Sequence, residues 1–166
     1  SVKLFVEPRP YREYAEEFVR FSLADYPTAD LLTLARIHES YDNVEQAYAC
    51  YAILAARPLS TEEARRVTLV AAALAAKTGR IDEAARLYRS PAAGSLSAEA
   101  RLELARAYRD AGRTDAARAE AEAVLAAAGA SDRERRRARI LVADTFRDRK
   151  DFAEAAKRYG EIPPVE

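Results

Sequence analysis

The strongest constraint on the fold of this sequence is a spaced pair of alanines that occurs four times. The second alanine follows the first by twelve residues, in Ala35/Ala47, Ala72/Ala84, Ala105/Ala117 and Ala143/Ala155. Apolar residues recur around these alanines at helical spacing, as Leu104, Ala105 and Tyr108 do. Each pair of alanines therefore predicts two short amphipathic helices joined by a turn.

The spacing of the units predicts how the helix pairs are arranged. The second alanines are separated by 37, 33 and 38 residues, so the units have similar lengths. A helical hairpin this small cannot bury its apolar faces alone and needs copies of itself on either side. Alanine at a helix crossing lets the two axes approach to about 8–10 Å. The sequence thus predicts an all-α fold of stacked helix pairs.

These repeats resemble the tetratricopeptide family, whose units of about 34 residues carry a small residue in the middle of each helix and an aromatic residue one turn later. Tyr51, Tyr88 and Tyr159 stand at that aromatic place in three of the second helices. The resemblance implies an α-solenoid, a right-handed superhelix of about nine helices. We expect an extended segment at 1–10 and one repeat domain at 11–166, with a half repeat at 11–27 and repeats at about 28–59, 60–96, 97–130 and 131–162.

The N-terminal helix, expected from Tyr11 to Asp25, looks like the second helix of a unit whose first helix is missing. Together with Ser1 at the start, it indicates a piece of a longer protein. The excess of arginine over lysine hints at a bacterial source. We expect the Phe18 and Phe21 side of this helix to present apolar surface that promotes self-association.

Helix ends are marked by polar residues and glycine. Capping pairs of the Ser/Asp-x-x-Glu type are expected at four helix starts, namely Asp42/Glu45, Ser60/Glu63, Ser131/Glu134 and Asp151/Glu154. Gly79 and Gly112 suit a left-handed residue at a helix end, and Asp42 and Lys150 stand at the same place in the other two turns.

Composition restricts the function. Lys+Arg and Asp+Glu balance at 27 each, so no net charge attracts the chain to nucleic acid or anionic lipid. No run of about 18 apolar residues occurs, so we expect no direct membrane insertion of this chain. A single cysteine forms no internal disulfide and leaves the compartment open between bacterial cytoplasm and periplasm, with a membrane-anchored parent protein as one alternative.

Residues for catalysis are scarce. His38 is the only histidine and stands where the family has a core aromatic residue, so we expect a packed imidazole rather than a general base. Cys50 is expected to fill space in the core. One histidine and one cysteine do not make a closed zinc site, and no glycine-rich phosphate loop is present. We therefore expect a protein that is not an enzyme and that needs no metal or cofactor.

The family resemblance implies a concave groove lined by the first helix of each pair. The candidate protein-binding residues there are Arg36, Leu69, Lys77, Leu102, Arg106, Arg109 and Arg147. Four aliphatic residues replace the lysine with which one subfamily holds a peptide carboxylate, so that chaperone-adaptor role is not expected. The arginines instead suit an acidic partner segment. Alternatively, they pair with Glu39, Glu99, Asp110 and Asp144 and only solvate the surface, which is the commoner role of a single surface arginine.

Two functions follow. The first is a scaffold that recruits a protein partner to a larger bacterial assembly. The alanine- and arginine-rich composition is similar to that of repeat domains in exopolysaccharide export or pilus biogenesis. The second is a structural spacer or regulatory segment of a larger enzyme.

Overall fold

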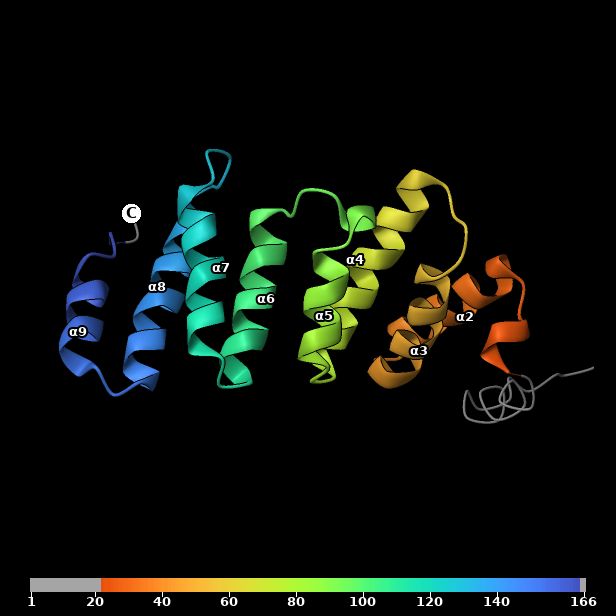
Figure 1. Ribbon diagram of the computed structural model, residues 1–166, viewed down its shortest axis with the longest axis horizontal. Helices are drawn as coiled ribbons and strands as arrows, with labels where there is room; N and C mark the ends of the chain where they lie inside the picture. The colour runs from red at the N-terminus through yellow and green to blue at the C-terminus, as the bar shows by residue number, and fades with distance from the viewer. Residues whose placement is uncertain (1–21, 165–166) are drawn as a thin grey trace, which may run out of the picture.

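The computed structural model describes residues 22–164, which contain eight α-helices, two short 3-10 turns and no strand (Figure 1). The α-helices are α2 (Thr28–Ser40), α3 (Val44–Ala55), α4 (Thr61–Lys77), α5 (Ile81–Tyr88), α6 (Ala98–Asp110), α7 (Thr114–Ala126), α8 (Asp132–Asp148) and α9 (Phe152–Gly160). The 3-10 turns are η1 (Leu23–Asp25) and η2 (Pro91–Ala93). The prediction of an all-helical chain is confirmed for these residues.

The helices stand side by side in chain order, and consecutive helices run in opposite directions (Figure 1). Each helix packs against its sequence neighbours. Helix α6 also packs against α4 and α8, so the first helices of the last three pairs contact each other. The loop that holds η2 folds back onto α4.

The repeated alanines all lie in the core. All eight are buried, seven of them completely, and Ala155 is 3% exposed. Tyr51 and Tyr88 are buried beside these contacts. The alanines are therefore core residues, as predicted, and their role in allowing close helix approach stays a prediction.

Two apolar clusters meet in the middle of the row. The first runs through α2 to α5 and takes in Leu104 and Tyr108 of α6 and Ala117 of α7. The second joins Leu102 and Ala105 of α6 to residues of α7 and α8. Helix α6 therefore contributes to both clusters, because its successive apolar residues point to opposite neighbours.

All four turns within the helix pairs have the same backbone structure. Asp42, Gly79, Gly112 and Lys150 have positive φ. In each turn the next N–H donates to the carbonyl five residues back, as Arg113 does to Tyr108 at 2.8 Å. This is the Schellman pattern of a helix C-terminus. The expected equivalence of Asp42 and Lys150 with the two glycines is confirmed.

Three of the expected caps are present and one is wrong. Ser60, Ser131 and Asp151 each accept a hydrogen bond from the backbone N–H three residues on. Asp42 does not cap α3, because it is the left-handed residue that ends α2, and Asn43 occupies the cap position without a side-chain bond.

Most of the expected N-terminal helix, with Phe18 and Phe21, lies outside the described residues. Its last residues differ from the prediction, since Leu23–Asp25 form a 3-10 turn rather than the end of an α-helix. Arg57 holds this turn by donating to the carbonyl of Ala24 at 2.8 Å and to that of Tyr26 at 2.7 Å. Helix α2 then begins at Thr28, after Pro27.

Candidate protein-binding face

Arg109 is occupied by carboxylates of the chain itself. Its Nη1 lies 2.7 Å from Oδ2 of Asp144, and its Nε lies 2.5 Å from Oδ2 of Asp148. The hydrogen bond from Arg109 lowers the pKa of Asp148. Arg109 thus links α6 to α8 and pairs with Asp144, as the alternative role of the arginines predicts.

Arg147 and Arg137 are neutralised in the same region. Arg147 lies 3.1 Å from Asp144 on its own helix, while Arg137 of α8 forms an ion pair with Glu99 of α6. The hydrogen bond from Arg137 lowers the pKa of Glu99. A cavity of about 260 Å³ lies in this region and is lined by Arg106, Arg109, Asp110, Arg137, Ile140, Leu141 and Asp144.

The aliphatic candidates differ in exposure. Leu102 is completely buried in the second apolar cluster, so it offers no surface to a partner and its place in the predicted groove is wrong. Leu69 of α4 is half-buried and packs on the edge of the first cluster. Leu32, at the same place in α2, is also half-buried.

Several exposed cations on the first helices have no ion-pair partner within the described part of the chain, and four of them lie at candidate groove positions. They are Arg36 on α2, Arg66 and Lys77 on α4, and Arg106 on α6. Arg66, Leu69, Ala73 and Lys77 follow one another at helical spacing on the least buried side of α4. A half-buried apolar strip therefore lies between two unpaired cations.

Two of these cations, from neighbouring helix pairs, act on the same tyrosine. The Tyr51 hydroxyl donates to Oε2 of Glu39 at 2.6 Å, and burial raises the pKa of Tyr51. The charges of Arg36 and Arg66 both act on this phenol in the opposite direction. Arg36 of α2 and Arg66 of α4 thus lie near one site. Lys77 lines a cavity of about 80 Å³ together with Glu39, Val44 and Leu74.

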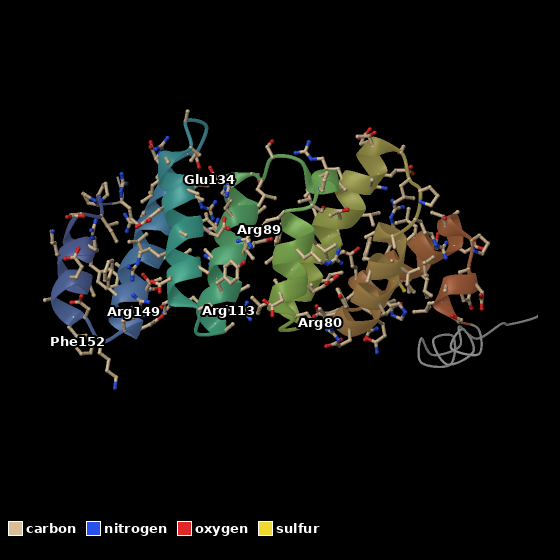
Figure 2. All side chains as sticks on the ribbon, viewed as in Figure 1. Arg80, Arg89, Arg113, Glu134, Arg149 and Phe152 are labelled. Carbon is tan, nitrogen blue, oxygen red and sulfur yellow. The ribbon has the colours of Figure 1, made fainter. Side chains whose placement is uncertain are left out.

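An ion-pair ladder that the sequence patterns did not predict runs along the turns. In the last three turns, an arginine in or next to the turn binds the acid at the second position of the preceding second helix, in Arg80–Glu45, Arg113–Asp82 and Arg149–Asp115. The three arginines lie along one edge of the row (Figure 2). The acids that recur at Glu45, Asp82 and Asp115 are the sequence feature from which this ladder could have been predicted.

Two arginines of the run at the start of α8 bind backbone carbonyls. Arg135 donates to the carbonyls of Leu125 and Ala127, both at 2.9 Å, and thereby satisfies the C-terminus of α7. Arg136 donates to the carbonyl of Pro163 at 2.6 Å. These contacts explain why arginines stand near a helix N-terminus, where a positive charge is otherwise unfavourable.

A buried carboxylate joins the second and third units. Glu120 of α7 is 9% exposed and lies 2.9 Å from Nη1 of Arg101 and 3.3 Å from Nη2 of Arg89. Arg89 ends α5, and Arg101 belongs to α6. This network adds to the apolar packing at the junction that contains the Ser90–Leu96 loop, where Leu104 and Tyr108 of α6 belong to the first cluster.

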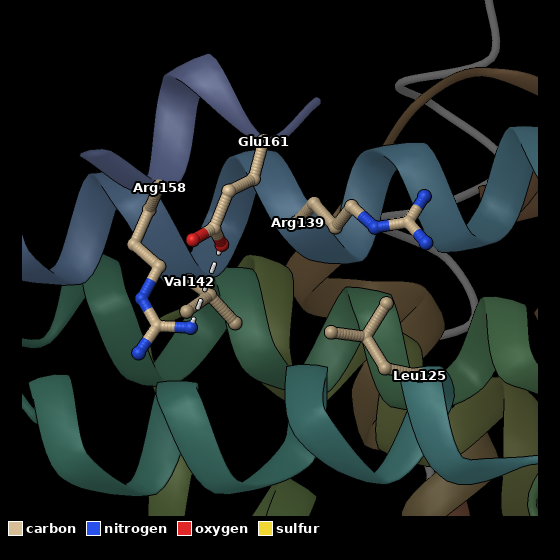
Figure 3. Close-up of a pocket in the computed structure, with 5 residues that line it drawn as sticks. All are labelled: Leu125, Arg139, Val142, Arg158 and Glu161. Atoms are coloured by element: carbon tan, nitrogen blue, oxygen red, sulfur yellow. Dashed lines mark ion pairs between the residues drawn. The ribbon is translucent and has the colours of Figure 1, made fainter. Parts of the chain in front are cut away.

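A smaller cavity of about 110 Å³ lies among α7, α8 and α9, with Leu125 and Val142 as its apolar walls. Figure 3 shows Arg158 and Glu161 facing each other on one side, with a separation of 3.7 Å, while Arg139 extends along the other side. This cavity offers no free charge on the α9 side, because Arg158 is matched by Glu154 and Glu161.

The two residues weighed for catalysis are in the core. His38 is 6% exposed, and burial lowers its pKa. Cys50 is completely buried, and burial raises its pKa to about 11. In residues 22–164 no three His, Cys, Asp or Glu side chains are grouped as metal ligands, and no helix there is both long and apolar enough to cross a bilayer.

Comparison of the chain with protein-family models, with curated proteins and with solved structures gives no match.

Proposed function

We propose that the chain is a tetratricopeptide-like scaffold that binds an acidic segment of a partner protein on its first-helix face. The repeated Schellman turns, the buried alanines and the regular helix order support a repeat array of this kind. Contacts of α6 with α4 and α8 support a row that curves toward the first helices, which makes their outer face the concave one.

The observation that carries the proposal is the difference between the two halves of this face. Around α6 and α8, Arg109, Arg137 and Arg147 are neutralised by the chain's own carboxylates. Around α2 and α4, Arg36, Arg66 and Lys77 have no such partners in the described region and flank half-buried leucines. We therefore place the acidic segment over α2, α4 and the Arg106 side of α6.

The physical basis is charge pairing next to apolar surface. A guanidinium that binds a carboxylate beside partly desolvated leucines forms a stronger hydrogen bond than a fully exposed pair. Leu32 and Leu69 supply the apolar contacts for a segment in which acidic and aliphatic residues alternate. The binding should weaken as salt concentration rises.

The test uses the full chain and a fluorescein-labelled peptide of alternating glutamate and leucine. The double variant Arg36→Glu/Arg106→Glu should reduce its affinity by about tenfold or more, since each charge-assisted bond contributes roughly 1.5–3 kcal/mol. Arg133→Glu/Lys150→Glu is the matched control, because it changes the net charge equally away from α2 and α4, at exposed residues without an ion-pair partner in the described part of the chain. Equal loss in both variants, or no loss in the first, would refute the proposed face.

Arg109 is unsuitable for this test. Its reversal would place a carboxylate beside Asp144 and Asp148 and disturb the contact between α6 and α8. This corrects the expectation that Arg106 and Arg109 belong to one free binding wall. The alternative function, a structural spacer, fits the α6–α8 half best, because the arginines there pair with carboxylates of the chain itself. A larger bacterial assembly, such as one for exopolysaccharide export or pilus biogenesis, stays a prediction from the sequence.

A further inference from the structure

One side of helix α9 is apolar and exposed. Phe152, the first residue of the helix, is 64% exposed and lies at the α9 end of the row (Figure 2). Ala153, Ala156 and Gly160 are also exposed, and their offsets of one, four and eight residues place them on the same side of the helix as Phe152. These four residues form the α9 end face, which carries no charged side chain. An exposed aromatic ring on such a face marks an interaction site.

No element of the described chain packs over the α9 end face. Helix α9 packs against α8, its neighbour in the row. Arg136, near the start of α8, holds the carbonyl of Pro163 at 2.6 Å, so the chain after α9 turns toward α8 at the helix end remote from Phe152. Residues 22–27 lie at the opposite end of the row (Figure 1).

The charges of α9 lie on its other sides and neutralise one another. Glu154 lies 2.7 Å from Nε of Arg158 and 4.0 Å from Nζ of Lys157. Arg158 also lies 3.7 Å from Glu161, which follows the helix. Two cations and two acids give residues 152–161 a net charge of zero. The surplus of cations in the last unit lies on α8, and physiological salt screens it beyond about 8 Å.

The α9 end face differs from the sides on which inner units stack. In α3, α5 and α7 the second residue is an acid, and an arginine of the next unit binds it, as Arg149 binds Asp115. Ala153 stands at this position in α9 and offers no carboxylate. The face therefore suits a contact without ion pairs rather than one more unit of the same row.

Gly160 indicates how close that contact is. It is helical without a positive φ, and open space surrounds the place where a β-carbon would stand. Glycine in a helix costs about 1 kcal/mol relative to alanine, and no contact within the chain requires it here. A glycine on an exposed helix side allows another backbone or a large side chain to approach closely.

We infer that two copies of this chain form a symmetric dimer through their α9 end faces, with the two α9 helices antiparallel and Ala156 at the two-fold axis. Phe152 lies four residues before Ala156 and Gly160 four residues after it. Antiparallel pairing about Ala156 therefore places Phe152 of each copy over Gly160 of the other. The ring fills the space that the glycine leaves, twice in each dimer. Because the helices are short, the contact belongs to the weak class of protein interfaces.

The first test is sedimentation equilibrium of the full chain from micromolar to submillimolar concentration. The wild type should follow a monomer–dimer equilibrium without larger species, since a symmetric contact uses the face of both copies. Higher salt should not weaken the dimer, because no ion pair holds it. Phe152→Glu should raise the dissociation constant more than tenfold. Ala119→Glu, on the exposed side of α7, is the control and should dimerise as the wild type does.

Three outcomes of this experiment would overturn the inference. They are a wild type that is monomeric at every concentration, a wild type that forms larger assemblies, and a Phe152→Glu variant that dimerises as well as the wild type. Circular dichroism of each variant confirms that it is folded.

Gly160→Leu separates the inferred pairing from unspecific apolar association. Leucine removes the space for the ring of Phe152 and should weaken the dimer, although it adds apolar surface and meets no obstacle within its own chain. A tighter dimer of Gly160→Leu would contradict the contact between Phe152 and Gly160.

A disulfide trap tests the position of the axis. Cys50 is completely buried and its pKa is raised to about 11, so it does not compete with an introduced thiol. Ala156→Cys should give a covalent dimer under mild oxidation, because its two copies meet at the axis. Ala119→Cys is the control and should stay monomeric in non-reducing electrophoresis. A failure of Ala156→Cys to cross-link at concentrations where the wild type dimerises would place the contact elsewhere and overturn the inference.

Discussion

Lys150 holds a backbone conformation that its side chain disfavours. Its φ is 65°, in the same turn position where Gly112 has a φ of 73°. A β-carbon in the left-handed region costs about 1–2 kcal/mol. The hydrogen bonds of the turn, including that from Asp151 to the carbonyl of Phe146 at 3.0 Å, keep Lys150 in this region.

Lys150→Gly should therefore stabilise the chain. The relief of strain exceeds the extra entropy that glycine gives the unfolded chain, about 0.4–1 kcal/mol, so we expect a net gain of roughly 0.5–1 kcal/mol. Urea denaturation measures this gain. Lys150→Ala is the control and should give no gain, since alanine keeps the β-carbon. Gly112→Ala should lose stability through backbone strain alone, because open space surrounds its added methyl group. A Lys150→Gly variant no more stable than Lys150→Ala would show that the turn stores no strain.

At the scale of the helices, close crossings depend on alanine. Ala105 of α6 and Ala117 of α7 are both completely buried, in a pair of helices that packs along its whole length (Figure 1). Added methyl groups at such a crossing push the two axes apart. The cavity beside α6 does not receive them, since it opens on the Arg106 side of that helix.

Ala105→Leu should destabilise the protein by about 1–3 kcal/mol through overpacking. The control is Ala119→Leu on the exposed side of α7, which should change stability by no more than about 0.5 kcal/mol. Thermal melts of both variants measure the difference. Equal melting temperatures would mean that these alanines are not the sites of closest helix approach.

The sequence predicted the helices well because their periodicity is local information. The eight alanines, His38 in the core and the serine caps all follow from spacing along one chain segment. The cap expected at Asp42 was wrong because Asp42-x-x-Glu45 satisfies a cap pattern as well as a turn. Only the backbone shows that Asp42 takes the left-handed position and Asn43 the cap.

The partners of the arginines were harder to predict than the helices. Arg109 meets Asp148 at a separation of 39 residues, and this contact depends on how far one unit is rotated relative to the next. The burial of Leu102 was hard to predict for the same reason. A small rotation of α6 about its axis decides whether an aliphatic residue on it faces the groove or the second cluster. Which cations lack a partner therefore depends on how the units pack together, and no single helix determines it.

At the scale of the whole molecule, Glu120 is a buried carboxylate that contacts arginines from two different units. It connects Arg89 at the end of α5 with Arg101 in α6, so one carboxylate from α7 joins the second unit to the third. Repeat arrays unfold cooperatively only when each interface between units is strong compared with the unit itself. The Glu120 network is therefore expected to couple the α2–α5 half to the α8–α9 half.

Glu120→Ala should weaken this coupling. Arg89 and Arg101 are partly exposed and regain water, so the expected loss is about 1–2 kcal/mol, below that of a fully buried pair. Native-state hydrogen exchange in increasing urea should show α8 and α9 opening with the same free energy as α4 and α5 in the wild type, but with a different one in the variant. Glu122→Ala, on the exposed side of the same helix, should leave the two halves opening together. If Glu120→Ala also opens as one unit, the two clusters are coupled by their shared residues on α6, Leu104 and Tyr108 on one side and Leu102 and Ala105 on the other.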